Sequence, residues 1–171
     1  MILSIHVLGG AAAASLAPNW LVSLLFSFFS HFLLDAIPHW HYPTYSERAN
    51  LRNGFKELVS LAYRPDRWAR HPLGRDAFSA GLDLLLGLAI LGGCLLYSES
   101  RSPLLLVLSG VVGVLPDFAT LLFILFPQNN FLAGFRLIHK NLHARTRLDD
   151  RYFEGISSQL AIALILIWLL I

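Results

Sequence analysis

Five long apolar runs dominate this 171-residue chain and limit the folds that it can adopt. They cover residues 2–17, 19–37, 77–97, 103–126 and 153–171. Each is close to the roughly 17 to 25 residues that a helix needs to cross a bilayer. Only 14% of the residues are charged, against about 25% in an average soluble domain. We therefore expect one all-α transmembrane domain over residues 1–171, a polytopic bundle of about five membrane-spanning helices.

The basic residues concentrate in two of the segments between these runs. They are Arg48, Arg52, Lys56, Arg64, Arg67, Arg70 and Arg75 in the first segment, and Arg136, Lys140, Arg145, Arg147 and Arg151 in the second. Five crossings place both segments on the same side of the membrane, and an excess of Lys and Arg marks the cytoplasmic side. The sequence thus predicts a multi-pass protein of the cell inner (cytoplasmic) membrane, with its N-terminus in the cytoplasm.

Both basic segments have the spacing of amphipathic helices, at residues 46–71 and 129–147. In the second, Phe131, Phe135, Ile138 and Leu142 form an apolar stripe with His139 and His143 at its edge. Such helices lie in the membrane interface. We therefore predict two cytoplasmic surface helices beside the spanning helices.

The chain also contains a candidate internal repeat, of residues 1–45 and 77–122. Each half has a polar residue near its start, His6 or Asp83, and a proline followed by His39 or Asp117 near its end. This pattern predicts a duplicated helical hairpin, with the two copies related by an axis along the membrane normal.

The stretch SHFLLDAIPHWHY, residues 30–42, places His31, Asp35 and His39 four residues apart. Residues i and i+4 share one helix face, so His31 and Asp35 can bind one metal ion together. The residue before Pro38 is biased out of the helical conformation, so we expect His39 in a turn that folds back toward the pair. His139 and His143 have the same spacing, but the glutamate of a zincin H-E-x-x-H motif is replaced by Lys140.

Eight metal-competent side chains are predicted to share the cytoplasmic leaflet. They are His6, His31, Asp35, His39, Asp83, Asp117, His139 and His143. A carboxylate inside a membrane span costs roughly 2.5 to 3.5 kcal/mol, and a divalent cation removes this cost for several groups at once. Eight ligands exceed the four of a tetrahedral zinc site, so we expect one or two divalent transition-metal ions, with zinc as the leading candidate.

Some of these residues have plainer interpretations. His6 could hydrogen-bond to a neighbouring helix, Asp83 could pair with an arginine, and Asp117 could satisfy a kink at Pro116. His41 is interpreted as a residue of the membrane interface. A G-x-S-x-G elbow and a glycine-rich phosphate loop are absent, and the basic residues border membrane spans, so the sequence offers no nucleic-acid site.

The segments SHFLLDAIPH, GVLPD (residues 113–117) and HKNLH, with His6 near the start, resemble motifs of a known family. They are similar to those of the LexA-regulated, YdjM-like group of predicted membrane-bound metal-dependent hydrolases. The H-x-x-x-D pair is also similar to one in zinc-dependent phospholipase C. In the YdjM-like family the PD motif precedes SHLLLD, whereas here it follows. The resemblance implies a metal-dependent hydrolase.

The leading hypothesis is hydrolysis of a phosphoester, or another ester, of a lipid-like substrate near the cytoplasmic leaflet. The metal would activate water and polarise the scissile group. Asp83 or Asp117 could act as the general base, and Arg48, Arg52 and Lys56 could hold a substrate phosphate by charge. Two alternatives stay open: a cation or proton-coupled transporter, and a structural protein in which a metal joins the surface helices to the bundle.

Overall fold

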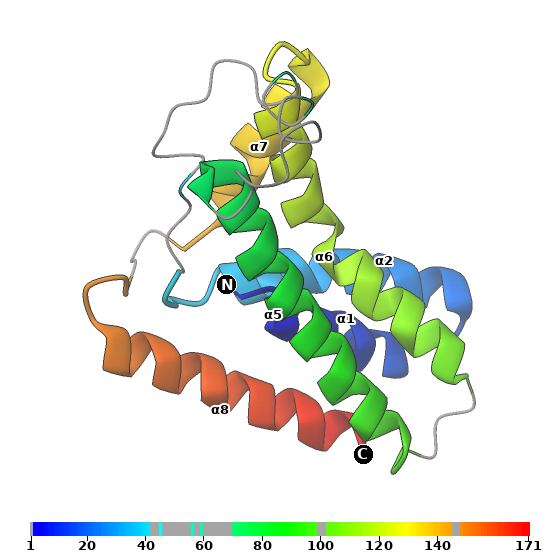
Figure 1. Ribbon diagram of the computed structural model, residues 1–171. Helices are drawn as coiled ribbons and strands as arrows, with labels where there is room; N and C mark the ends of the chain where they lie inside the picture. Colours follow the sequence, from blue (N-terminus) through cyan, green and yellow to red (C-terminus); the bar gives the residue numbers. More distant parts are fainter. Residues whose placement is uncertain are drawn as a thin grey trace.

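The computed structural model describes residues 2–41, 70–98, 102–144 and 148–171, together with Tyr45, Lys56 and Val59. These residues form helices and connecting segments without strands, which confirms the predicted all-α fold (Figure 1). The helices are α1 (Leu3–Ser15), α2 (Trp20–Asp35), α5 (Pro72–Leu95), α6 (Pro103–Leu125), α7 (Asn130–Leu142) and α8 (Tyr152–Leu170).

Three of the five predicted spans are helices long and apolar enough to cross a membrane: α5, α6 and α8. The other two are shorter apolar helices. With 13 and 16 residues, α1 and α2 extend over about 20 and 24 Å at 1.5 Å per residue, less than the roughly 30 Å of a hydrocarbon core. The chain turns at Pro18, and Asn19 caps α2 by accepting a hydrogen bond from the Val22 amide.

Helix α1 lies at the centre of the bundle and contacts α2, α5, α6 and α8. Eleven of its thirteen residues are buried. Glycines on the neighbouring helices allow this close packing. A Cβ on Gly113 of α6 would lie 2.5 Å from the His6 carbonyl oxygen, and one on Gly87 of α5 would lie 2.6 Å from the Ser4 Cα. Small residues therefore set the spacing of the helices, as is common in membrane bundles.

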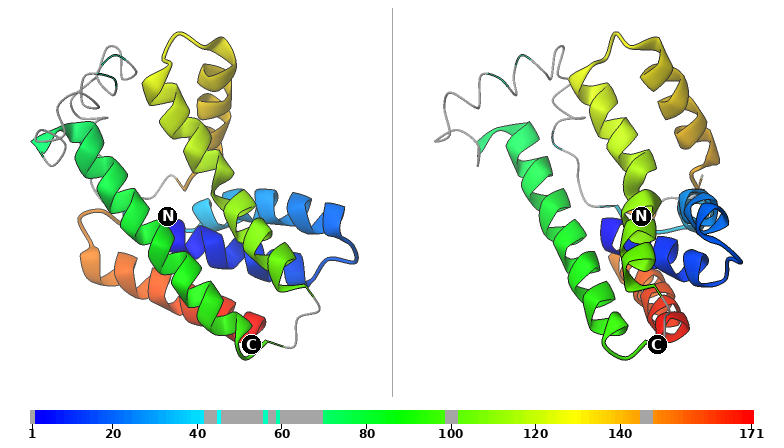
Figure 2. Two further views of the ribbon diagram at one scale, coloured as in Figure 1. Left: turned by 45° about the vertical axis from the view of Figure 1, so that its right-hand side comes forward. Right: turned by 90° about the vertical axis from the view of Figure 1, so that its right-hand side faces the viewer.

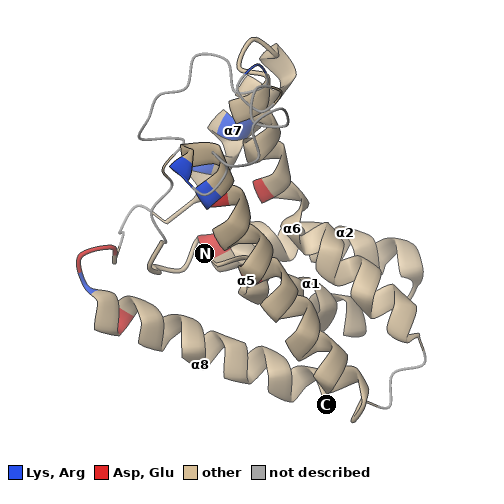
Figure 3. Ribbon diagram, viewed as in Figure 1, with Lys and Arg blue, Asp and Glu red and all other residues tan. Residues whose placement is uncertain are grey.

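The bundle has two chemically different ends. The acidic and basic residues coloured in Figure 3 lie on the first half of α5, on α6 and α7, and around the start of α8. The opposite end contains Ala14, Trp20, Ser98, Ser102 and Leu170. Figure 2 shows that α7 lies beside the last turns of α6, at the charged end. The charged end is the side of the molecule on which a membrane surface would meet water.

Within the second predicted surface helix, at 129–147, the structure has the helix α7, whose Phe131, Leu137 and Ile138 are exposed; its place at a membrane surface stays a prediction. Most of the first, at 46–71, lies outside the described residues. The predicted repeat corresponds to the hairpins α1–α2 and α5–α6, but their prolines differ in position. Pro38 follows the end of α2, whereas Pro116 lies inside α6. The duplication itself stays a prediction.

Candidate metal centre

One face of α2 carries a polar side chain at every fourth position: Ser23, Ser27, His31 and Asp35. All four are buried. A spacing of four residues keeps side chains on one helix face, and this face points toward α1 and α6. The charged half of the face, His31 and Asp35, forms the core of the candidate site.

Three ligand atoms of the site form a small triangle. His31 Nε2 lies 3.0 Å from His139 Nε2, and the Asp35 Oδ2 atom lies 3.1 Å from the first nitrogen and 2.9 Å from the second. Ligand atoms around a tetrahedral zinc, with bonds of about 2.0–2.1 Å, lie about 3.3 Å apart. The three atoms therefore have nearly the spacing that a bound metal ion would give them.

The other ring nitrogens of the two histidines fix where their protons are. His31 Nδ1 lies 2.9 Å from the Gly113 carbonyl oxygen, which can only accept, so Nδ1 carries the proton. Thr120 Oγ1 donates to the Pro116 carbonyl and lies 3.1 Å from His139 Nδ1, so it accepts from that nitrogen. In neutral imidazoles both Nε2 atoms then present lone pairs. Two lone pairs and a carboxylate this close are stabilised by a cation between them, which can be a proton or a metal ion.

His6 and Asp117 complete this part of the site. His6 Nε2 lies 3.2 Å from Asp35 Oδ1, and its ring stacks on His31 with centroids 4.0 Å apart. The other ring nitrogen of His6, Nδ1, has no hydrogen-bond partner in the described part of the chain. Asp117 Oδ1 lies 3.8 Å from His31 Nε2 and 3.9 Å from His139 Nε2. Asp117 is 29% exposed and Asp35 only 1%, so the site opens at Asp117.

His39 and His143 approach the Asp35 carboxylate from its other side. His39 Nε2 lies 3.8 Å from Oδ1, and His143 Nε2 lies 3.6 Å from Oδ2. As expected from Pro38, α2 ends before His39, which folds back to the helix end. Burial lowers the pKa of His39 to about 3 and that of His143 to about 4. Both rings are therefore neutral at physiological pH, the form in which histidine binds metals.

The residues present fit a metal ion on chemical grounds. Imidazole nitrogens and carboxylate oxygens are ligands of zinc and of other divalent transition metals. Buried polar groups without partners are costly, and His6 Nδ1 is such a group here. An added proton could satisfy one pair of nitrogens, whereas a metal ion can accept several lone pairs at once. The group His31, Asp35, Asp117 and His139 could thus hold a metal.

The structure brings together seven of the eight predicted ligands, and Asp83 is the exception. Its carboxylate accepts hydrogen bonds from the backbone amides of Leu3 and Ser4. It therefore caps the first turn of α1, whose orphan amides favour a negative charge, and it belongs to neither group of metal-competent residues found in the described ranges.

The predicted phosphate-binding residues are not placed in this site. Arg48 and Arg52 lie outside the described residues, and Lys56 is exposed.

The sequence does not predict the surroundings of these ligands. Thr120 orients His139, the Gly113 carbonyl orients His31, and the Asp149 carboxylate accepts a 2.9 Å hydrogen bond from His41 Nδ1. The four-residue spacing from Ser23 to His39 is the signal in the sequence that identifies the inward face of α2 as a whole. The contact between the Gly113 carbonyl and His31 cannot be recognised in the sequence, because every residue has a backbone carbonyl.

Comparison with known proteins gives no relative from which to transfer a function. No family model, curated protein or solved structure matches this chain.

Proposed function

We propose that this protein is a membrane-embedded, metal-dependent hydrolase. Its substrate would be a phosphoester, or another ester, of a lipid-like molecule at the cytoplasmic leaflet of the inner membrane. The observation that carries the proposal is the convergence of lone pairs at Asp35, where His31 Nε2 and His139 Nε2 lie 3.0 Å apart beside one carboxylate oxygen. The motif resemblance to membrane-bound hydrolases agrees with this chemistry.

A divalent ion held at this point, with zinc as the leading candidate, would acidify water and polarise the scissile ester or phosphoryl group. His31, Asp35 and His139 would hold the ion, with His6 and Asp117 at the next shortest distances. Asp117 is the general base in this proposal because it is the more exposed carboxylate and faces the opening. Asp83 is left out because the backbone of α1 occupies its oxygens.

The position of the site favours a substrate that lies in the membrane. His139 and His143 belong to α7 and its C-terminal cap, and the exposed side chains of α7 include Phe131, Leu137 and Ile138. A helix of this kind rests in the interface with its apolar side chains among the acyl chains. Ester bonds of lipids occupy the same depth. The basic residues Arg75, Arg136 and Lys140 near this end support a cytoplasmic orientation.

The polar face of α2 also suggests transport as an alternative function, because Ser23 and Ser27 continue this face from the site toward the opposite end of the bundle. Their hydroxyl groups donate to backbone carbonyls of α1, at Ala14 and Gly10. Hydroxyls engaged in this way tie two helices together, and among the described residues the histidines and carboxylates gather at one end of α2 and do not continue along these serines. Hydrolysis therefore remains the preferred proposal, and transport is an outcome of its test.

The test combines metal analysis with an assay in vesicles. We expect the purified wild-type protein to contain stoichiometric metal by elemental mass spectrometry. We also expect it to release inorganic phosphate from phosphatidic acid, or fatty acid from a phospholipid, in reconstituted vesicles. His139→Ala should lose both properties. Ser109→Ala is the matched control, because Ser109 is equally buried and its hydroxyl has no partner in the described residues.

Three results would overturn the proposal. Wild-type protein without metal after chelator-free purification would exclude the metal site. Bound metal with ions crossing the vesicle membrane, and no product, would favour transport. Bound metal with neither hydrolysis nor transport would favour the structural role.

A further inference from the structure

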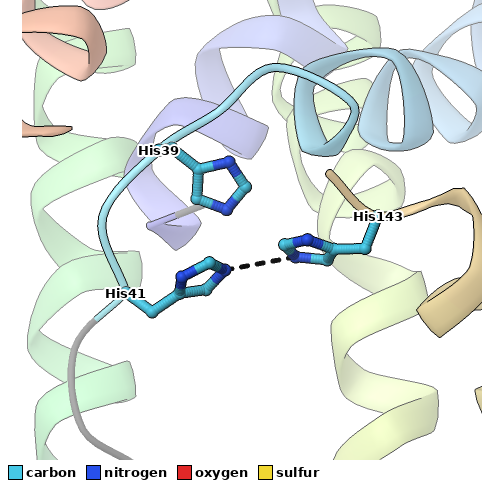
Figure 4. A group of neighbouring side chains, drawn as sticks. All are labelled: His39, His41 and His143. Atoms are coloured by element: carbon cyan, nitrogen blue, oxygen red, sulfur yellow. Dashed lines mark hydrogen bonds between the residues drawn. The ribbon is translucent and has the colours of Figure 1, made fainter. Parts of the chain in front are cut away.

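A second group of histidines stands next to the proposed metal site. It consists of His39 and His41, in the segment after α2, and His143, at the C-terminal cap of α7 (Figure 4). One ligand nitrogen from each lies within 4.8 Å of the others. The rings of His39 and His41 have centroids 4.3 Å apart, and that of His143 is 4.9 and 5.0 Å from them. Three imidazoles from two distant parts of the chain thus face one another.

The backbone holds these two parts of the chain together. The Ala144 amide donates to the Asp35 carbonyl at 2.8 Å, and the Leu148 amide donates to the His39 carbonyl at 3.2 Å. The amide of His41 donates to the Asp149 carboxylate at 3.1 Å. Asp35, His39 and His41 are therefore each hydrogen-bonded to one of Ala144, Leu148 and Asp149. This pairing fixes the positions from which the three rings extend.

Hydrogen bonds direct the Nε2 atoms of the group inward. His39 Nδ1 donates to the Ile37 carbonyl at 2.6 Å, and His41 Nδ1 donates to Asp149 Oδ1 at 2.9 Å. Each ring thus keeps its proton on the outer nitrogen. A carboxylate that accepts from one histidine nitrogen while the other faces a metal is a common arrangement in metalloproteins. Here Asp149 has that place behind His41.

The inner nitrogens face one another. His39 is fully buried, and its Nε2 has no hydrogen-bond partner in the described ranges. His41 Nε2 and His143 Nε2 lie 3.4 Å apart, close to the roughly 3.3 Å between ligands of a tetrahedral metal. At this distance one ring can donate to the other, and a metal ion between them would bind the lone pairs of both.

We propose that His39, His41 and His143 form a second metal position, and that the Asp35 carboxylate bridges it to the first. Asp35 Oδ2 lies 2.9 Å from His139 Nε2 and 3.6 Å from His143 Nε2, while Oδ1 lies 3.8 Å from His39 Nε2. One carboxylate thus reaches both groups. The ligand class is a divalent transition metal, because three imidazoles and a carboxylate suit zinc, manganese, iron or nickel.

Both positions reach the surface. The side chains of His41 and His143 are 25% and 20% exposed, and Asp117 of the first position is 29% exposed. An ion at either position could therefore contact an incoming substrate. This inference rests on the proposed function, since two ions near one another can hold the attacking and the leaving oxygen of a phosphoester.

The test counts metal ions in the full-length protein in detergent, loaded with Mn²⁺ and freed from excess ion. Wild-type protein should bind two ions per chain, with the electron paramagnetic resonance signal of a spin-coupled pair. His41→Ala should bind one ion and give the signal of an isolated Mn²⁺. Asp149→Asn keeps the shape of the side chain and should weaken only the second ion, by about 10- to 100-fold.

Gly92→Ala is the control, since a Cβ there meets no atom within 4 Å, and it should bind two ions. One ion in the wild type, or two coupled ions in His41→Ala, would overturn the second position. If His41→Ala fails to fold, Asp149→Asn decides: equal affinity of both ions with the wild type would overturn it. Two coupled ions without lipid hydrolysis would refute the proposed function alone, and one ion with hydrolysis would refute the second position alone.

Discussion

The buried face of α2 has two halves that share a spacing and differ in how their polar groups are satisfied. In the first half, Ser23 and Ser27 donate their hydroxyl protons to carbonyls within the bundle, with Ser27 Oγ 2.8 Å from the Gly10 oxygen. In the second half, His31 and Asp35 meet other lone pairs. A buried polar residue whose side chain is hydrogen-bonded to the backbone is thus structural. One whose side chain faces other potential metal ligands is a candidate for function.

This difference gives a criterion that burial alone does not provide. Ser27, His31 and Asp35 are all at most 1% exposed. The Ser27 hydroxyl forms its hydrogen bond within the protein and needs no bound ion. The Asp35 carboxylate lies among histidine nitrogens, where a bound cation would stabilise it.

The largest effect is expected for Asp35→Asn, which removes the charge at the centre of both groups. Metal affinity should fall by more than about 100-fold, beyond the 10- to 100-fold typical of outer-shell residues. Competition with a fluorescent chelator measures this change. The metal-free variant should be at least as stable as the metal-free wild type, because a neutral amide replaces a buried charge. Unchanged affinity would contradict the role of Asp35.

The second largest effect is expected for Gly113→Ala, which disturbs the packing of α6 against α1 next to His31. The new Cβ would lie 2.5 Å from the His6 carbonyl oxygen, and overpacking typically costs about 1–3 kcal/mol. Metal affinity should fall as well, because the Gly113 carbonyl orients His31. Reversible unfolding in mixed micelles measures the stability. Gly81→Ala, where a Cβ meets nothing within 4 Å, should not be destabilised.

A smaller effect is expected for Thr120→Val, which keeps the shape of the side chain and removes the partner of His139 Nδ1. Metal affinity should fall by about 10- to 100-fold. Thr120→Ser keeps the hydroxyl group and should restore most of it. Equal affinity in the valine and serine variants would mean that this hydrogen bond does not orient His139.

The smallest effect is expected for Ser27→Ala, which alters the structural half alone. The free energy of unfolding should fall by about 0.6 kcal/mol, the average for an interhelical hydrogen bond in a membrane protein. Metal affinity should equal that of the wild type. A loss of metal comparable to that of Asp35→Asn would remove the distinction between the two halves.

The sequence contains enough information to predict the helical fold and most of the site. The spacing of His31, Asp35 and His39 places them at one helix end, and the pair His139 and His143 indicates a second contributor. These inferences succeed because the period of a helix determines which residues share a face.

The remaining features depend on contacts between helices. Asp83 has the sequence features of a ligand, yet its partners are backbone amides of α1. Every residue except proline has such an amide, so the sequence does not indicate which amides a carboxylate will contact. The short length of α1 and α2 follows from where Pro18 and Pro38 end them, whereas hydropathy reports only apolar content. His41 joins the second group because Asp149 pairs with it from 108 residues away. Sequence spacing carries no information about such a distance.

The burial of α1 also determines when this molecule can become complete during synthesis. Its neighbours α5, α6 and α8 all follow it in the chain, so α1 is synthesised before the helices that bury it. Until then, the 13 residues of α1 are too few to cross the membrane unaided. His6 can take its place only when those helices arrive, so metal bound at the proposed site would report on assembly of the bundle.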